Sequence, residues 1–236
     1  MGAAPTAAEL LALWERLART PAPRRAVVLA GDSEGASLGE LQAAALELYA
    51  RTFGDRIDCA DRCPDCGAGI VVEVSAAALI AAQRAAPEAR GLLEADGWSL
   101  RYRLPVAADL ERAAALGDAE AASAALVAAV VRESRKDGQP AGTRELPPAI
   151  AAALAERIEA EDPLSAPELA VVCPECGQSM LRPFDAPPAF LARLEAWARR
   201  TLWEVHQLAM RYGWSEADLL AMPAFRREAY LLMDAP

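Results

Sequence analysis

Four cysteines of this chain occur in two copies of one short turn, Cys-Pro-x-Cys-Gly. The first copy runs from Cys63 to Gly67, and the second runs from Cys173 to Gly177, 110 positions further along the chain. Two cysteines at this spacing present two thiolates to one metal ion, and the glycine lets backbone N–H groups point at the sulfurs. Each turn supplies two ligands, whereas a structural zinc ion takes four. We therefore expect one structural Zn²⁺ ion, held by Cys63, Cys66, Cys173 and Cys176.

Two other interpretations of the cysteines stay open at this stage. The hairpins could be metal-free and held by packing, or a Cys-x-x-Cys pair could be a redox site. A redox pair is expected between a strand and a helix, whereas both pairs here lie between two strand-like segments. Cys59 precedes Cys63 by four residues, and we interpret it as a small core residue rather than a fifth ligand.

The segments around the turns predict how the cysteines are positioned. Strand-like segments flank each turn, and a helical segment follows each copy, so the sequence contains an internal repeat of a β-hairpin with a trailing helix. Metal-binding cysteine pairs are usually about 15–20 residues apart, so the long stretch between these pairs is an insertion. The expected fold class is α+β and mostly helical, with two zinc-knuckle β-hairpins that form one four-cysteine zinc ribbon, a helical insertion and a long C-terminal helix.

Four segments follow from this pattern. Residues 1–54 form N-terminal helices, among them a capped helix from Ser37, although residues 24–32 fit helix and strand equally well. Residues 55–75 and 168–186 form the split zinc ribbon. Residues 76–167 form the helical insertion, with a short strand at 98–104, a helix at 119–134 and an exposed loop at 135–145. Residues 187–236 form the C-terminal helical segment.

The long helix expected over residues 187–213 has two distinct faces. Apolar residues at helical spacing predict a core-facing stripe of Leu191, Leu194, Ala198, Leu202, Val205, Ala209 and Tyr212. Trp203, His206 and Met210 lie on a flank of this stripe. They are either the edge of a wide core stripe or an exposed apolar patch, and we take them as a candidate partner surface.

Composition and charge narrow the function classes. The net charge of −10 disfavours nucleic acid and anionic membranes as partners, and no patch of basic and aromatic residues stands out in the sequence. No apolar run is long enough to cross a bilayer and no secretory leader is evident, so five cysteines point to a reducing, cytoplasmic location. The acidic stretches at 156–163 and 215–220 are interpreted as exposed helix faces. We find no catalytic constellation and expect no enzyme.

The order of these pieces resembles the T4-type baseplate hub assembly family of contractile phage tails and phage-tail-like contractile injection systems. The resemblance covers about residue 40 to the end and is carried by "CADRCPDCGAGIVVEVS", "LAVVCPECGQSMLRPFD" and most specifically "EVHQLAMRYGWSEADLLAMPAFRREAYL". It implies a non-enzymatic assembly chaperone or structural protein that binds baseplate hub or wedge proteins, with no nucleic acid and no membrane insertion. Whether the protein stays in the particle or leaves after assembly is open. The alternative is a zinc-ribbon adaptor in transcription or RNA metabolism.

Overall fold

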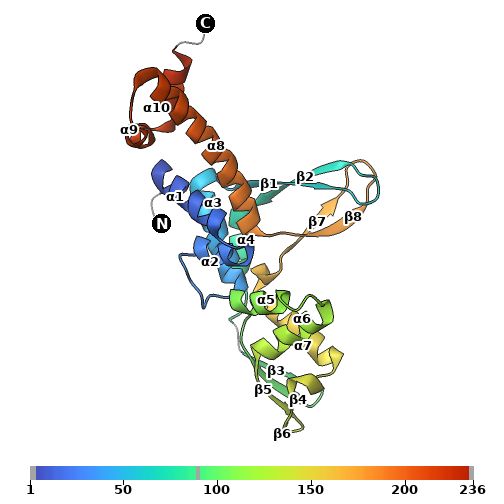
Figure 1. The fold of residues 1–236 in the computed structure, drawn as a ribbon. Helices are drawn as coiled ribbons and strands as arrows, with labels where there is room; N and C mark the ends of the chain where they lie inside the picture. The colour runs from blue at the N-terminus through green and yellow to red at the C-terminus, as the bar shows by residue number, and fades with distance from the viewer. Residues whose placement is uncertain (1–3, 89–90, 234–236) are drawn as a thin grey trace. The chain divides into compact units, whose positions relative to one another are not determined.

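The computed structural model describes residues 4–88 and 91–233. The chain divides into two compact units, one of Met1–Pro21 with Pro188–Pro236 and the other of Ala22–Pro187 (Figure 1). The cysteines lie in the second unit and the candidate partner surface lies in the first. The α+β class with mostly helical elements, expected from the sequence, is confirmed.

Three helices form the N-terminal part of the second unit. They are α2 (Arg25–Leu29), α3 (Leu38–Phe53) and α4 (Ala76–Ala85), and a short 3₁₀ turn, η1 (Ala22–Arg24), precedes them. The open question at residues 24–32 is thereby settled: the segment is helix over Arg25–Leu29 and turn or bend over residues 30–32. Ser37 caps α3 in a capping box with Glu40, and Gly54 ends the helix at a φ of 92°, as its sequence predicts.

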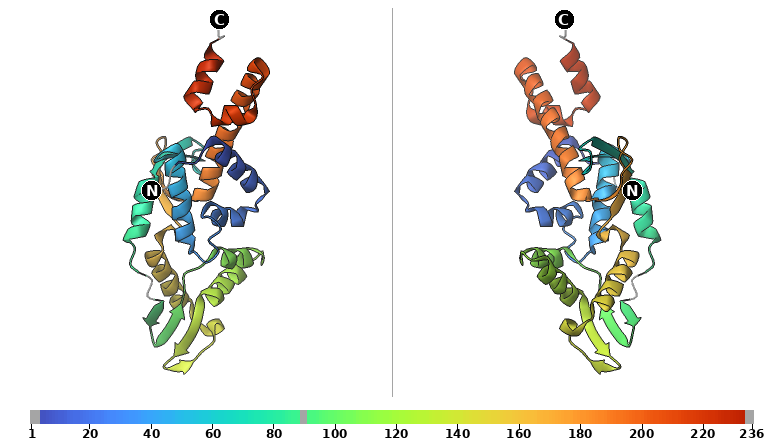
Figure 2. Two further views of the ribbon diagram at one scale, coloured as in Figure 1. Left: turned by 90° about the vertical axis from the view of Figure 1, so that its left-hand side faces the viewer. Right: turned by 90° about the vertical axis from the view of Figure 1, so that its right-hand side faces the viewer.

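The second unit also contains two antiparallel hairpins. The first, hairpin 1, consists of β1 (Arg56–Arg62) and β2 (Gly69–Ser75), and the second, hairpin 2, consists of β7 (Glu168–Val172) and β8 (Ser179–Pro183). Figures 1 and 2 show the two hairpins in the same part of the second unit. Their bounds agree with the predicted strand–knuckle–strand pattern to within a residue or two, because β-branched runs and tight turns are local signals.

The insertion between the hairpins contains more strand than the sequence predicted. Its antiparallel sheet has the order β3 (Leu92–Ala95), β4 (Trp98–Tyr102), β5 (Val131–Lys136) and β6 (Gln139–Pro140). The helix expected over 119–134 is wrong beyond α6 (Ala119–Val130), since the chain there pairs with β4. The expected loop at 135–145 is in part a hairpin, closed by Asp137 and Gly138 at φ values of 49° and 80°.

The remaining elements of the insertion are α5 (Ala107–Ala114), α7 (Pro148–Glu161) and the 3₁₀ turns η2 (Thr143–Glu145) and η3 (Pro163–Ser165). Ala107 of α5 packs with Val27 of α2 and Leu41 of α3. One hydrophobic core cluster joins the sheet to α6 and α7, with Leu100 and Leu154 almost completely buried.

The first unit contains α1 (Ala7–Arg19), most of α8 (Ala186–Tyr212), α9 (Glu216–Ala221) and α10 (Ala224–Leu232). The end of α8 packs on α9 and α10 through Val205, Leu208 and Leu219. The aromatic rings of Tyr212 and Trp214 stack beside them at 4.6 Å between centroids.

The prediction that Leu202 belongs to the core stripe of α8 is wrong. Leu202 is 36% exposed, whereas Thr201 and Leu208 are buried. The buried stripe is centred on residues 194, 198, 201, 205 and 208, so position 202 falls outside it. None of the helices over the described ranges combines the length and apolarity that a bilayer crossing needs.

Candidate metal centre

The turns of the two hairpins bring four sulfurs together. The Sγ atoms of Cys63, Cys66, Cys173 and Cys176 all lie within 4.8 Å of one another. Two of these distances join one hairpin to the other, 3.6 Å from Cys63 Sγ to Cys176 Sγ and 3.7 Å from Cys66 Sγ to Cys173 Sγ. The two cysteine pairs therefore share one site rather than forming two.

This spacing fits a tetrahedral metal ion. Zinc–thiolate bonds are about 2.3 Å long, so the edge of a tetrahedron of four sulfurs is about 3.8 Å. The two distances between hairpins are close to that edge. The four-cysteine group is thus able to hold a metal ion, and it supplies every ligand of a tetrahedral site.

The two turns have the same hydrogen bonds. In hairpin 1 the Cys63 N–H donates to the Ala68 carbonyl at 2.9 Å, and in hairpin 2 the Cys173 N–H donates to the Gln178 carbonyl at 2.9 Å. Gly67 and Gly177 have φ values of 72° and 75°, a left-handed conformation that glycine adopts without strain. The glycine of each Cys-Pro-x-Cys-Gly copy is therefore required by the turn itself.

The sulfurs perturb one another's protonation. Backbone N–H groups, first that of Cys176, lower the pKa of Cys173 to about 7. At Cys176, the Gln178 N–H also lowers the thiol pKa. The neighbouring sulfur of Cys173 and desolvation by burial outweigh it, and together they raise the pKa of Cys176 to about 12. Four adjacent thiolates repel one another, so a bound cation is what allows all four to ionise together.

A small core supports the sulfurs. Cys63 and Cys173 are buried together with Ile70 and Val171, while the other two cysteines of the group are exposed. Cys59 lies outside the four-sulfur group and is only partly buried. Its burial, and then the charge of Asp58, raise its thiol pKa.

Buried polar residues that the sequence analysis missed hold the base of hairpin 2. Asp162, just before η3, is completely buried, although its acidic stretch was interpreted as exposed; that interpretation is wrong for Glu161 and Asp162. The Asp162 carboxylate accepts hydrogen bonds from the Ser37 hydroxyl at 3.1 Å and the Gly39 N–H at 3.0 Å, at the N-terminus of α3. An anion is favoured there because the first N–H groups of a helix have no partner within the helix.

Helix α3 also holds the other end of hairpin 2. The Gln42 amide donates to the Asp185 carboxylate at 2.8 Å and accepts from the Ala186 N–H at 2.8 Å. The entry and the exit of hairpin 2 are therefore both bonded to the first two turns of α3. No local sequence signal identifies these contacts, because the partners are more than 120 positions apart.

An ion pair joins the hairpins to each other. Arg182 of β8 lies 2.8 Å from the Asp61 carboxylate and donates to the Arg62 carbonyl at 3.1 Å. The hairpins are thus linked to each other at the sulfurs and along their strands, while the base of hairpin 2 is bonded to α3.

The candidate partner surface lies on α8, in the first unit. Trp203 is 58% exposed, Met210 is 76% exposed and His206 is also exposed, so they are not the edge of the core stripe. Arginines accompany them: Arg199 lies about 40° from Trp203 around the helix and Arg200 about 60°. Two arginines therefore lie near the exposed apolar side chains of α8, although the net charge of the whole chain is −10.

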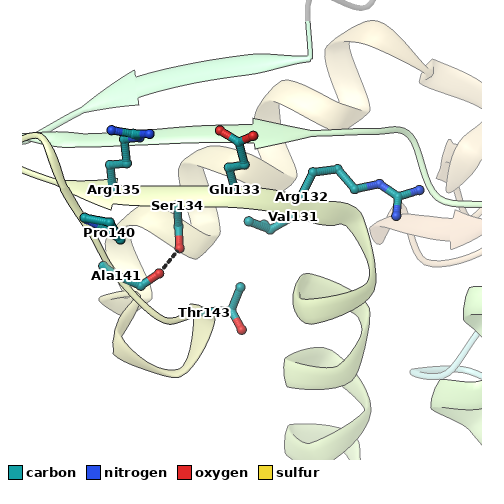
Figure 3. Close-up of a pocket in the computed structure, with 8 residues that line it drawn as sticks. All are labelled: Val131, Arg132, Glu133, Ser134, Arg135, Pro140, Ala141 and Thr143. Atoms are coloured by element: carbon teal, nitrogen blue, oxygen red, sulfur yellow. Dashed lines mark hydrogen bonds between the residues drawn. The ribbon is translucent and has the colours of Figure 1, made fainter.

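A pocket elsewhere in the second unit lies beside β5 and β6 (Figure 3). Its Ser134 hydroxyl donates to the Ala141 carbonyl, and Glu133 and Arg135 extend from the side of β5 opposite Ser134. Among the residues that line it, no nucleophile lies beside a base. The residues that line this pocket therefore give no evidence for a catalytic site.

Comparison of the chain with protein-family models, curated proteins and solved structures found no significant match.

Proposed function

We propose that this protein is a non-enzymatic assembly factor or structural component of the baseplate of a contractile injection system or phage-tail-like particle. It acts by protein–protein binding, with hub or wedge proteins as its partners. The observation that carries the proposal is the exposed Trp203 and Met210 on α8. Met210 lies within the part of the sequence that resembles the baseplate hub assembly family most specifically, and Trp203 directly precedes that part. Large apolar side chains exposed on a helix are typical of partner surfaces.

We propose zinc as the ion of the four-cysteine group, with a structural role. Four thiolates at tetrahedral spacing suit zinc, and a site with four protein ligands has no open position for a water or a substrate. In this role the ion holds the tips of the two hairpins together. The residues around it orient the ligands through the two matching turns.

The test is the assembly of contractile particles in cells that produce this protein. Deletion of the gene should abolish assembly of complete particles, and Trp203→Asp with Met210→Asp should abolish co-purification with baseplate proteins while zinc content and fold are retained. Phe225→Asp, at a residue of α10 that is 72% exposed, is the matched control. If particles assemble and fire normally after the deletion, the baseplate function is excluded and the zinc-ribbon adaptor becomes the better hypothesis.

A further inference from the structure

The exposed face of α8 is distinctive in its charge. The helix carries four arginines, Arg193, Arg199, Arg200 and Arg211, and only two glutamates, Glu195 and Glu204. By helical geometry, Trp203 and Met210 lie within about 20° of each other, and Arg199 and Arg200 lie about 40° and 60° from Trp203. Arg211 and Glu195 both lie about 80° from Trp203, and Glu204 lies about 100° away. The charged residues nearest to the apolar stripe are therefore arginines.

The two acids are already engaged within the first unit. Glu195 pairs with Arg199 at 2.6 Å, and Glu204 lies 3.2 Å from Arg227, a buried arginine of α10 that also donates to the Met222 carbonyl at 2.7 Å. Glu204 also lies 3.8 Å from Arg200, so its charge is shared between Arg227 and Arg200. The arginines of α8 still outnumber its glutamates by four to two, so the helix keeps a net positive charge.

The basic face belongs to an otherwise acidic protein. The first unit contains eight basic and eight acidic residues, so the whole net charge of −10 falls on the second unit. A basic face in a neutral unit selects a partner of opposite charge, because complementary charges set specificity more than affinity. Trp203 and Met210 are seven residues apart, or about 10 Å along the helix axis, which matches two turns of a second helix.

We propose that this face of α8 binds an acidic amphipathic helix of a partner protein. Two apolar side chains of that helix, seven residues apart, contact Trp203 and Met210, and its flanking carboxylates lie against Arg199, Arg200 and Arg211. This inference rests on the proposed function, in which the same surface binds the baseplate partner. An acidic helix fits better than a nucleic acid strand, since single-strand binding uses several stacking aromatics and the second unit repels a polyanion.

The test uses the full-length, metal-loaded protein and two designed helical peptides with leucines at the same i and i+7 positions. One peptide has glutamate flanks and the other has lysine flanks. The glutamate peptide should bind at least about tenfold more tightly, and salt should weaken its binding. Arg199→Glu with Arg200→Glu should invert this preference, whereas Arg226→Glu, on α10, should leave it unchanged.

Three results would overturn the inference. They are equal binding of the two peptides, no binding of the glutamate peptide, and equally tight binding of a single-stranded oligonucleotide. Trp203→Ala with Met210→Ala should weaken both peptides about tenfold, which separates the apolar contribution from the charge contribution. If the charge test fails while Trp203→Asp with Met210→Asp still abolishes co-purification with baseplate proteins, the proposed function stands and only the acidic-helix partner is excluded.

Discussion

Hairpin 1 and hairpin 2 have the same turn sequence but differ in how their bases are held. At hairpin 1, the residue before β1 bonds to the end of β2 and the start of α4: the Asp55 carboxylate accepts from the Ser75 hydroxyl and the Ala77 N–H, both at 2.7 Å. At hairpin 2, the base is held by α3 through Asp162 and Gln42, more than 120 positions away. The first copy is closed by its own neighbours, and the second depends on the rest of the unit.

The outer faces of the hairpins both carry exposed apolar side chains. Val71 of hairpin 1 is 70% exposed, and Val172 of hairpin 2 is 63% exposed. On hairpin 1, Arg56 also pairs with Asp58 and Glu73, both at 2.8 Å, as expected of a solvated surface. The difference between the two copies therefore lies in how their bases are held, not in the exposure of their strands.

The largest expected effect is loss of the bound metal ion, and a cysteine substitution in either hairpin should cause it. Cys63→Ser and Cys173→Ser each remove one buried ligand, and each should abolish zinc binding, whose free energy at structural sites is on the order of 10 kcal/mol. Metal analysis of purified protein should give one zinc per chain for the native sequence. A variant that keeps its zinc, or a native stoichiometry of two, would falsify the shared site.

The next largest effect should be a loss of stability that is greater in hairpin 2 than in hairpin 1. A Cβ at Gly39 would lie 2.0 Å from the Asp162 carboxylate, so Gly39→Ala should destabilise the second unit by about 2–3 kcal/mol. Hydrogen exchange should then accelerate in β7 and β8 more than in β1 and β2. Gly35→Ala is the control, because nothing lies within 4 Å of its Cβ, and it should change stability by less than about 0.5 kcal/mol. Equal acceleration in both hairpins would contradict the difference between their bases.

This contrast also shows what the sequence can predict. Both hairpins, the capped start of α3 and the meeting of the four cysteines follow from local signals: a repeated turn, β-branched runs and a capping box. The strand β5 does not follow from local signals, because Val130 and Val131 continue an apolar pattern that fits helix and strand alike. Only the pairing with β4 makes this segment a strand. Asp162 was missed for a related reason: whether an acid is buried depends on partners that the local sequence does not contain.

A third prediction compares equivalent positions in the two hairpins. Cys59 precedes Cys63 by four residues, and Leu169 precedes Cys173 by four; both are partly buried. Leu169→Ala should cost about 1–2 kcal/mol because Leu169 packs on the core beneath the sulfurs, whereas Cys59→Ala should cost less than about 1 kcal/mol. Both variants should retain one zinc ion. Loss of zinc in Cys59→Ala would instead identify Cys59 as a ligand.

The smallest effect should be a pH dependence at the base of hairpin 1. The Ala77 N–H and then the Ser75 hydroxyl hold the pKa of Asp55 below its usual value. The folded carboxyl therefore binds a proton less readily than the unfolded one, whose pKa is about 3.9, so these bonds stabilise hairpin 1 above that pH. The stabilisation is lost as the pH falls through the lowered pKa of the folded state. A carboxyl ¹³C NMR titration should give Asp55 a pKa below 3.9, and Ser75→Ala should raise it part of the way back. Gln42→Ala, which loosens only the base of hairpin 2, should leave this titration unchanged; a shift in that variant would mean that the two bases are coupled.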